Sequence, residues 1–283
     1  MKRSAMRLGL LSLLVAGSVW AAPKPPAAPE PAVPPHLIQM IDKVSQGQLI
    51  VKKSFDVNPQ FNGLLVAPKQ GGREMIVFTD KPGNFLFFGT VVDAKGDNLT
   101  QTYYQKYVIS DMASKAFAEI KQTHWFADGK DSAKHKLYVV IDLNCSFCHK
   151  QFEDLQPMVQ RGDLQIRWVP VGFLKPDSAA KAAQLLKASS TQERVALLHR
   201  DEMGFNDKTE EGGIKPLKMD KSNPAVVQAF AAVDANNDFF ARHGFQGTPA
   251  ILFINGEGQP SLVGGYVPAA QIEKFLQDVS NHF

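Results

Sequence analysis

Two cysteines, Cys145 and Cys148, are the residues whose type and spacing point most clearly to chemistry. They are the only cysteines of the chain, and Ser146 and Phe147 separate them. A disulfide between residues this close encloses almost no chain, so it would stabilise the fold little. A pair that cycles between dithiol and disulfide is therefore favoured over a structural bridge or inert thiols. Ser146 and Phe147 are predicted to tune its redox properties.

The residues around the pair predict how the two thiols divide the work. Apolar residues 137–141 indicate a strand and residues 147–160 a helix, so Cys145 should lie at the start of that helix. Unpaired backbone N–H groups and the helix dipole favour a thiolate there. We therefore predict that Cys145 attacks, and that Cys148, one turn further along and less exposed, resolves a mixed disulfide.

Metal binding is the other chemistry that two cysteines can support. His149 follows Cys148, but the remaining histidines show no ligand-like spacing to the pair, so a tetrahedral structural zinc site is not expected. Two thiolates could still bind Cu(I), and this alternative stays open. We expect His149 to be a solvated surface residue and assign it no role. The prediction is no metal, and no cofactor other than the redox-active Cys145–Cys148 disulfide.

A proline at the start of a predicted strand is a further local signal. Thr248 and Pro249 precede the apolar residues 250–254. Proline has no N–H to donate to a neighbouring strand, so a proline at this position indicates a special backbone conformation. An X-Pro bond is the one peptide bond that readily adopts the cis form. Alone, this dipeptide indicates little.

The N-terminus predicts export. Three basic residues precede the apolar residues 8–20, and small residues stand where a signal peptidase reads, so residues 1–21 are predicted to be a signal peptide cleaved near Ala21. Those three residues account for the whole formal net charge of +3. The balance favours neither nucleic acid nor an anionic membrane as partner. The apolar run is too short to span a bilayer comfortably, so no membrane insertion is expected.

The chain after this segment begins with a proline-rich tether and a small domain. Residues 22–36 contain seven prolines and favour an extended conformation. Residues 37–109 are predicted to form an N-terminal domain, in which an amphipathic helix precedes an antiparallel sheet. Turn signals separate the short apolar runs of this sheet, which lie at residues 49–51, 64–66, 75–79, 85–88 and 99–109.

A linker helix and a second domain follow. Residues 110–127 are predicted to form the helix, and residues 128–283 an α/β domain. A helical insertion at about residues 176–243 should contain at least three helices, because residues 204–223 are polar and loop-like. The other elements of this domain are strand 137–143, helix 147–160, strand 164–171, strands 251–254 and 261–263, and helix 269–279.

These features together resemble a known family. A C-x-x-C after one strand and Thr248-Pro249 before another are similar to the thioredoxin superfamily. The layout, and residues 168–183, resemble the periplasmic disulfide isomerases of the DsbC and DsbG type. That family usually has Pro-Tyr or Gly-Tyr between the cysteines and a proline two residues before the first. This chain has Ser146-Phe147 and Leu143 there, and retains Asp142.

The resemblance implies an α+β fold with a cystatin-like N-terminal dimerisation domain, a linker helix and a C-terminal thioredoxin-like domain. It implies that the Thr248-Pro249 bond is cis, lies beside the thiols, offers backbone hydrogen bonds to substrate and helps to keep metal away. It also implies a V-shaped homodimer through the N-terminal domains, located in the periplasm. A membrane reductant of the DsbD type would keep its thiols reduced.

The predicted function is therefore thiol:disulfide interchange on exported proteins, as isomerase and reductase, including reduction of sulfenylated cysteines. Two alternatives stay open, a net disulfide oxidase of the DsbA type and a holdase chaperone that binds unfolded chains. The separate N-terminal domain argues against the oxidase. Its aromatic residues are compatible with interchange or with chaperone activity, but ordinary core packing is the expectation for its phenylalanines, which are Phe55, Phe61, Phe78, Phe85, Phe87 and Phe88.

Overall fold

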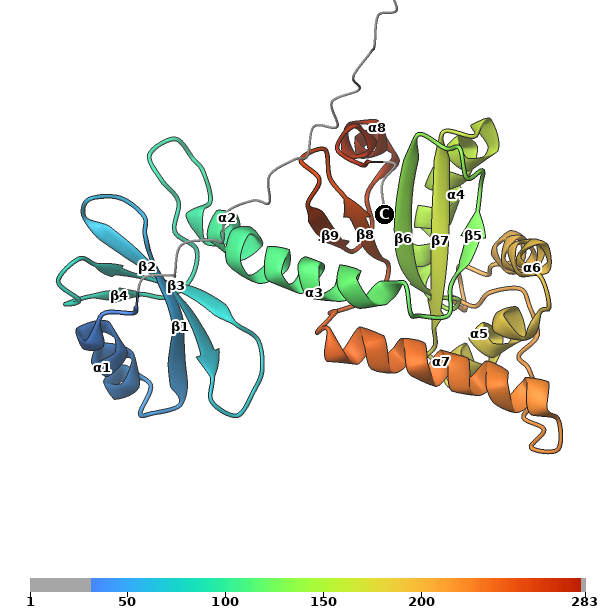
Figure 1. Ribbon diagram of the computed structural model, residues 1–283, viewed down its shortest axis with the longest axis horizontal. Coiled ribbons are helices and arrows are strands. Elements are labelled where there is room, and N and C mark those ends of the chain that lie inside the picture. Colours follow the sequence, from blue (N-terminus) through green and yellow to red (C-terminus); the bar gives the residue numbers. More distant parts are fainter. Residues whose placement is uncertain (1–31, 281–283) are drawn as a thin grey trace, which may run out of the picture.

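The computed structural model describes residues 32–280, which form two domains joined by a helical segment (Figure 1). The predicted signal peptide and most of the predicted tether lie outside these residues. In the described part of the chain no helix is long and apolar enough to cross a bilayer. The predicted α+β fold class, with a helix and an antiparallel sheet before a linker helix and a second sheet, is confirmed.

The N-terminal domain is a four-stranded antiparallel sheet buried on both faces. Successive residues of its second strand point to opposite sides. Leu64 and Val66 pack with Leu37 of the first helix, whereas Leu65 packs with Val108 on the other side. The elements, in chain order, are α1 (Pro35–Val44), β1 (Leu49–Asp56), β2 (Phe61–Pro68), β3 (Met75–Asp80) and β4 (Leu86–Phe87). Pro35 opens α1, so the helix starts inside the predicted tether; proline is tolerated in a first helical turn.

Residues 99–109, predicted as a strand, are helical. The side chain of Asn98 caps their first turn by accepting a backbone N–H at 2.9 Å. Tyr103 and Tyr107, four residues apart, both pack on Phe55, with ring centroids 4.6 and 4.5 Å away. The predicted strand is wrong because these aromatic residues follow a helical spacing. The segment comprises α2 (Leu99–Tyr104) and the π-helical turn η1 (Gln105–Ile109), which continues into α3 (Ser110–Ile120).

The linker helix is shorter than predicted and packs on the second domain. After α3 ends at Ile120, residues Phe126–Asp128 form β5, which pairs antiparallel with the strand that contains Trp168. Phe117 and Ile120 are buried against this second sheet. The C-terminal part of the helical segment therefore helps to cover the sheet of the second domain rather than forming a free connection.

The second domain is built on a five-stranded mixed sheet with the order β5-β7-β6-β8-β9. β6 and β7 are parallel, and the other pairs are antiparallel. Its remaining elements are β6 (His135–Asp142), α4 (Ser146–Arg161), β7 (Leu164–Val171), α5 (Ser178–Lys187), α6 (Thr191–Met203), α7 (Pro224–Arg242), β8 (Ala250–Ile254), β9 (Pro260–Gly264) and α8 (Ala269–Gln277). The predicted insertion of at least three helices is confirmed by α5, α6 and α7.

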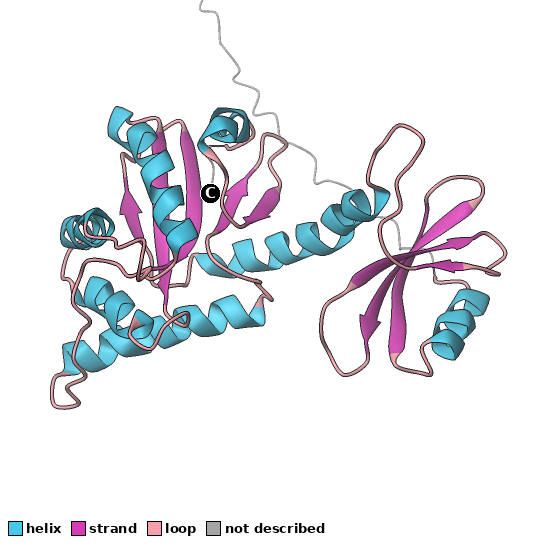
Figure 2. Ribbon diagram, turned by 180° about the vertical axis from the view of Figure 1, so that it is seen from behind, coloured by secondary structure: helices cyan, strands magenta, loops and turns pink. Residues whose placement is uncertain are grey.

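Helices cover both faces of this sheet, and β6 lies at its centre. Leu137, Val139 and Ile141 of β6 pack with α4 and α8 on one face. Tyr138 and Val140 pack with α3 and α7 on the other. Figure 2 shows α4 lying along the first face. Because β6 is buried on both sides, its C-terminal end is held rigidly where the cysteine pair begins.

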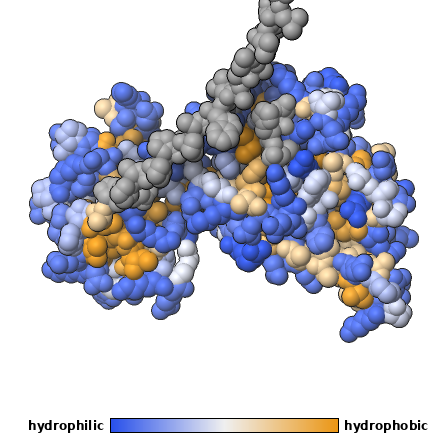
Figure 3. All heavy atoms as spheres, in the orientation of Figure 1, coloured by the Kyte–Doolittle hydropathy of each residue, from blue (hydrophilic) through white to orange (hydrophobic). Residues whose placement is uncertain are grey.

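The phenylalanines of the N-terminal domain correct an expectation. Phe78 is buried and Phe55 is half-buried, but Phe85 is 64% exposed, and Phe61, Phe87 and Phe88 are also exposed. Core packing is therefore wrong for these four. Phe85, Phe87 and Phe88 lie on or beside the edge strand β4, and Phe61 of β2 packs against Phe87 at a centroid distance of 5.8 Å. In Figure 3 apolar side chains also gather on this domain around α1.

Candidate active site

Cys145 lies where β6 has ended and α4 begins. Its backbone N–H donates to the carbonyl of Asp142 at 3.1 Å, and the residue is the N-cap of α4. Its Sγ accepts the backbone N–H of Cys148 at 3.3 Å. The structure thus places this sulfur at the end of a helix that favours an anion, as predicted.

The environment of Cys145 favours its thiolate. The pKa of Cys145 is lowered to about 6, mainly because the Cys148 thiol donates a hydrogen bond to it. Burial opposes this shift, since the residue is only 7% exposed, but the Thr248 hydroxyl and backbone N–H groups of α4 reinforce it. A thiol with this pKa is largely ionised at neutral pH and is nucleophilic.

Cys148 has the opposite character. It is 2% exposed, and burial raises its pKa well above the usual value. The neighbouring Cys145 raises the pKa further, both by accepting a hydrogen bond from the Cys148 thiol and by its negative charge. At neutral pH Cys148 therefore keeps its proton. The two thiols of one motif are chemically distinct because one caps the helix and the other points into the core.

The Thr248-Pro249 peptide bond is cis, as the family resemblance implied. The bond precedes β8, which pairs directly with β6, so it lies at the sheet edge that carries Cys145. The Thr248 carbonyl oxygen is 3.4 Å from Cys145 Sγ. The Thr248 hydroxyl is buried beside the two sulfurs, and hydrogen bonding from it lowers the pKa of both thiols.

The two residues between the cysteines differ in exposure. Phe147 is 55% exposed, and its ring stacks on Tyr266 at a centroid distance of 6.3 Å. Lys150 lies over the same ring at 5.8 Å. Ser146 is half-buried in the first turn of α4. Phe147 therefore offers an apolar surface two residues from Cys145 in the chain.

Two further apolar side chains lie at the same edge of the sheet. Phe173 and Leu174 follow β7, which is parallel to β6, and both are close to half exposed. Their backbone N–H groups donate to Asp142 Oδ2 at 2.9 and 3.0 Å. Since Asp142 ends β6, the backbone at Phe173 and Leu174 lies near the start of the cysteine motif. The Phe173 ring packs on Phe240 of α7 at a centroid distance of 4.8 Å. We call Phe147, Phe173 and Leu174 the apolar rim.

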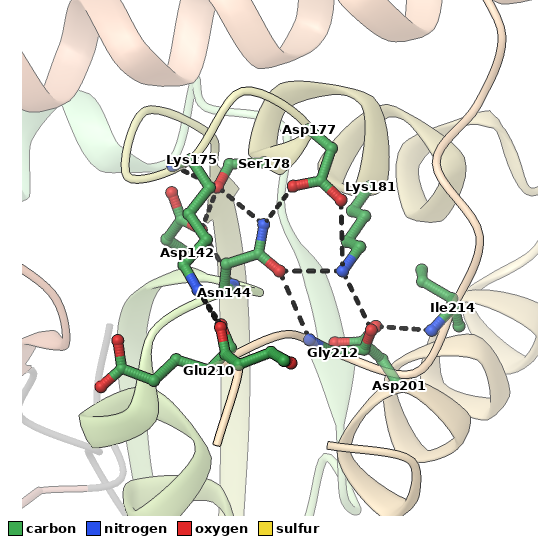
Figure 4. Close-up of polar contacts among 11 residues, drawn as sticks. Asp142, Asn144, Lys175, Asp177, Ser178, Lys181, Asp201, Glu210, Gly212 and Ile214 are labelled. Carbon is green, nitrogen blue, oxygen red and sulfur yellow. Dashed lines mark hydrogen bonds and ion pairs between the residues drawn. The ribbon is translucent and has the colours of Figure 1, made fainter. Parts of the chain in front are cut away.

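The residues just before Cys145 are tied to the insertion by buried polar groups (Figure 4). Asp142 is fully buried, and its Oδ1 accepts the Asn144 backbone N–H at 3.0 Å and the Ser178 hydroxyl at 2.8 Å. The Asn144 side chain contacts Lys181 of α5 at 2.8 Å. Sequence reasoning noted Asp142 but missed Asn144 and Lys181. Both are polar residues next to apolar ones, which is a weak sign of a buried polar contact. A single sequence cannot show that Asn144 contacts Lys181, because 37 residues separate them.

His149 is not the solvated surface residue that was expected. Its side chain is 13% exposed, and its Nδ1 lies 2.7 Å from Oε2 of the buried Glu202 in α6. Glu202 raises the pKa of His149 by accepting this hydrogen bond. Burial raises the pKa of Glu202 itself, and His149 counteracts that effect. The expectation is wrong because the insertion folds back over the start of α4.

The described part of the chain contains no group of three or more His, Cys, Asp and Glu side chains arranged to hold a metal ion. Cys145 and Cys148 are the only thiols of the chain, and both are free in this structure. The arrangement of the two sulfurs, the cis-proline loop and the apolar rim suits exchange between a cysteine pair and a disulfide in a polypeptide.

Comparisons with known proteins identify relatives along most of the chain. Residues 124–280 match the family described as Thioredoxin-like domain. The chain is 28% identical over 275 residues to the thiol:disulfide interchange protein DsbG of Pseudomonas aeruginosa, covering 97% of each. It is 26% identical over 223 residues to Escherichia coli DsbG, covering 79% of this chain and 83% of that one.

A solved structure of a DsbG protein is also similar. The structure of Helicobacter pylori DsbG aligns with 76% of this chain and 98% of its own, with a TM-score of 0.38 and 17% sequence identity. The catalytic domain of Proteus mirabilis ScsC aligns with 58% of this chain and 96% of its own, with a TM-score of 0.42 and 19% identity.

Proposed function

The chain belongs to the thioredoxin-like domain family and is a thiol:disulfide interchange oxidoreductase of the DsbG type, and we propose that it acts as a disulfide isomerase and reductase on exported proteins in the periplasm. The observation that carries this proposal is the contrast between Cys145, whose pKa is about 6, and the buried Cys148, whose pKa is raised. One thiol is ready to attack, and the other is kept back for a second step.

In the first step the Cys145 thiolate attacks one sulfur of a substrate disulfide. A bond forms between the two sulfurs, the substrate disulfide breaks, and the released substrate thiolate takes a proton from solvent. With a sulfenylated substrate cysteine the thiolate attacks its sulfur, and the hydroxyl leaves as water after protonation. Both reactions give the same mixed disulfide on Cys145.

The mixed disulfide then has two fates. If another substrate thiolate attacks, the substrate disulfide is rearranged, Cys145 is released, and no electrons are transferred overall. If Cys148 attacks Cys145 Sγ, the substrate leaves reduced by two electrons and the enzyme holds a Cys145–Cys148 disulfide. Bonding of Cys145 removes the negative charge that helps to raise the pKa of Cys148. Cys148 is therefore easier to deprotonate at the stage where its thiolate is needed.

Substrate binding is assigned to the cis-proline loop and the apolar rim. Thr248 and Pro249 precede a strand whose neighbour carries Cys145, so the backbone of this loop can pair with an extended substrate segment. The apolar rim would contact apolar side chains beside the substrate cysteine. Such residues are exposed in misfolded exported proteins and buried in correctly folded ones, which gives a physical basis for selecting misfolded chains.

A continuous supply of electrons is part of the proposal. Net reduction consumes one Cys145–Cys148 dithiol in each cycle, and the chain has no other cysteine to restore it. A membrane reductant of the DsbD type is the proposed donor. The export signal predicted at residues 1–21 supports a location where disulfides form in exported proteins.

We also propose that the protein is a homodimer through its N-terminal domains. The short strand β4 ends the N-terminal sheet, and exposed phenylalanines lie beside it. An apolar sheet edge of this kind favours association with another chain. Light scattering on the mature chain at micromolar concentration should give the mass of a dimer, and a monomer would contradict this part of the proposal.

Chaperone activity is a second candidate, supported by the same surface. Phe61 and Phe87 line a cavity of 330 Å³ together with Phe78 of the core. An open apolar cavity on an exposed surface can hold apolar side chains of unfolded proteins. Suppression of aggregation by a Cys145→Ser variant would support this activity, because that variant lacks the attacking thiol.

Refolding of a scrambled-disulfide protein tests the main proposal. Cys145→Ser should abolish the reaction, lowering the rate about a thousandfold or to background. Cys148→Ser should retain isomerisation, because the substrate's own thiol can resolve the mixed disulfide, but it should lose net reduction. Equal refolding by wild type and Cys145→Ser would disprove the proposal.

The direction of electron flow separates this proposal from an oxidase of the DsbA type. Rapid acid quenching of cells followed by thiol alkylation should find Cys145 and Cys148 mostly reduced. A pair that is wholly oxidised in cells would favour the oxidase and exclude a resting reductase.

A further inference from the structure

The helical insertion contacts the residue that directly precedes the attacking thiol. Residues 204–214, which we call the insertion loop, follow α6. The backbone N–H of Gly212 in this loop donates to Asn144 Oδ1 at 3.3 Å. Only glycine fits at this position, because a Cβ there would lie 2.1 Å from Asp201 Oδ2. The loop backbone is therefore packed tightly against α6 while it contacts Asn144.

Lys181 of α5 is the centre of this contact (Figure 4). Its Nζ donates to Asn144 Oδ1 at 2.8 Å and to the Gly212 carbonyl at 2.9 Å. It also lies 3.4 Å from Asp177 Oδ2. Only 3% of Lys181 is exposed. One ammonium group thus joins the insertion loop, α5 and the residue before Cys145.

A buried ammonium is an expensive way to stabilise a fold. Removing a charge from water costs several kcal/mol, and partners recover that cost only when the geometry is good. Packing by an apolar side chain of similar length would often serve stability as well. The position of Lys181 beside the active site therefore favours a role in fixing local geometry.

Asn144 is the group that this geometry fixes. Its amide nitrogen donates to Asp177 Oδ1 at 2.8 Å and to Ser178 Oγ at 3.0 Å, so both ends of its side chain are held. Its backbone N–H is held by Asp142. The peptide that enters Cys145 consequently has little freedom. Cys145 keeps the N-cap conformation in which its sulfur accepts the N–H of the resolving cysteine.

The insertion contacts the other end of the motif as well. His149 directly follows Cys148, and the Phe205 ring of the insertion loop stacks on it at a centroid distance of 4.3 Å. Glu202, two residues before the loop, bonds to the same histidine. The loop and the end of α6 therefore touch the chain on both sides of the cysteine pair.

We propose that Lys181 is a positioning residue for Cys145, which acts by holding Asn144 against the insertion loop so that Cys145 remains the N-cap of α4. This role concerns the proposed interchange reaction and rests on the proposal that Cys145 is the attacking thiol. It does not depend on whether isomerisation, reduction or oxidation dominates. Lys181 is buried and touches neither sulfur in the described contacts.

Alkylation of Cys145 by iodoacetamide as a function of pH tests this role without any substrate. In a Cys148→Ser background, Lys181→Met should lower the alkylation rate at pH 6 about fivefold and move the midpoint of the profile to higher pH, because a displaced N-cap no longer favours the thiolate. In the chain with both cysteines, the equilibrium with glutathione should shift about fivefold towards the disulfide, since the reduced form loses stabilisation.

Lys175→Met is the matched control. Lys175 Nζ donates to the carbonyl groups of Thr209 and Glu210, so it anchors the same loop but makes no described side-chain contact with Asn144. This variant should leave the alkylation midpoint unchanged. A midpoint shift as large as that of Lys181→Met would overturn the specific role of Lys181.

Lys181→Gln separates position from charge, and it also carries the test if Lys181→Met does not fold. A glutamine amide can still donate to Asn144 Oδ1, so it should restore most of the alkylation rate at pH 6. If Lys181→Gln is as slow as Lys181→Met, the charge rather than the position acts on Cys145, and the proposal is wrong. A lowered melting temperature with an unchanged midpoint would likewise show a purely structural residue.

Discussion

The two sheets of this protein differ in the groups packed around them. Polar groups are buried beside the second sheet, whereas aromatic side chains are exposed beside the first. In the catalytic domain helices cover both faces, and polar groups such as Asp142 and Lys181 are buried with partners. In the N-terminal domain both faces are also covered, but aromatic side chains remain exposed at the β4 edge. Buried polar groups position a reaction, whereas exposed apolar groups favour association.

This contrast separates the surroundings of the thiols from the surface for which we propose association with another chain. A reacting thiol needs fixed geometry, and the polar network around Asn144 provides it at one end of β6. A surface that meets another chain needs free apolar area, which Phe85 and Phe88 provide far along the sequence from the thiols. Substitutions in the two regions should therefore affect different properties.

The largest effect is expected at the buried carboxylate of Asp142. Asp142→Ala leaves the backbone N–H groups of Phe173 and Leu174 without their acceptor, and it should reduce the free energy of unfolding by about 3 to 5 kcal/mol. Urea unfolding of the reduced protein at pH 7 measures this. As a control, Asp154→Ala removes a carboxylate that accepts the Tyr266 hydroxyl near the surface, and it should cost about 1 kcal/mol. An equal loss in the free energy of unfolding for both variants would show that the hydrogen bonds of Asp142 stabilise the fold no more than an ordinary surface contact.

A smaller, pH-dependent effect is expected at Asp201. Burial raises its pKa to about 7, and its Oδ2 has no hydrogen-bond partner among the described residues. A carboxyl whose pKa rises on folding adds stability below its ordinary value of 3.8, and that stability is lost as the pH rises towards 7. Asp201→Asn cannot ionise, so it should become more stable than wild type by about 4 kcal/mol over this range.

Urea unfolding of both proteins from pH 4 to pH 8 follows this difference. The gap between Asp201→Asn and wild type should widen up to about pH 7 and then stay constant, because the native carboxyl is ionised above its pKa. A gap that does not change with pH would mean that Asp201 is ionised throughout the range in the folded protein.

A still smaller effect is expected at the Thr248 hydroxyl. Thr248→Val removes a group that lowers the pKa of Cys145 while keeping the size of the side chain and the backbone carbonyl. In a Cys148→Ser background, alkylation of Cys145 at pH 6 should become about threefold slower, with the same plateau at high pH. An unchanged profile would leave the helix N-terminus and its amides as the groups that favour the thiolate there.

The smallest effect on stability is expected in the N-terminal domain. Phe88→Ser should change the free energy of unfolding by about 0.5 kcal/mol or less, because the side chain is exposed. It should nevertheless weaken self-association or suppression of aggregation. Phe78→Ala is the buried comparison and should cost about 3 to 5 kcal/mol. If Phe88→Ser alters neither association nor chaperone activity, the exposed aromatic edge has no binding role.

Much of the fold could be predicted because local patterns are strong in the catalytic domain. The predicted strand at residues 164–171 has the bounds of β7, and the three helices of the insertion were expected. The strand predicted at residues 99–109 is wrong, since its aromatic residues pack through a helical spacing that becomes recognisable only beside the sheet. β5 was missed because three residues carry too little pattern.

Some residues of the candidate site could also be predicted from the sequence, and others could not. Cys145 and Cys148 could be found because their spacing and the preceding strand are local features, and Thr248-Pro249 could be found by family resemblance. His149 was expected to be solvated, yet Glu202 and Phe205 cover it. Contacts between distant segments leave no mark in the local pattern, so a single sequence could not assign them.

The sequence by itself determined that two thiols lie at the end of a buried strand and the start of a helix, since adjacent residues specify both elements. That placement alone predicted which thiol attacks. Only the tertiary structure decided how strongly the two differ, because burial of Cys148, the Thr248 loop and the Asn144 network come from segments far apart in the chain. Hydrogen bonds and burial act through space, and the reactivity of Cys145 depends on both.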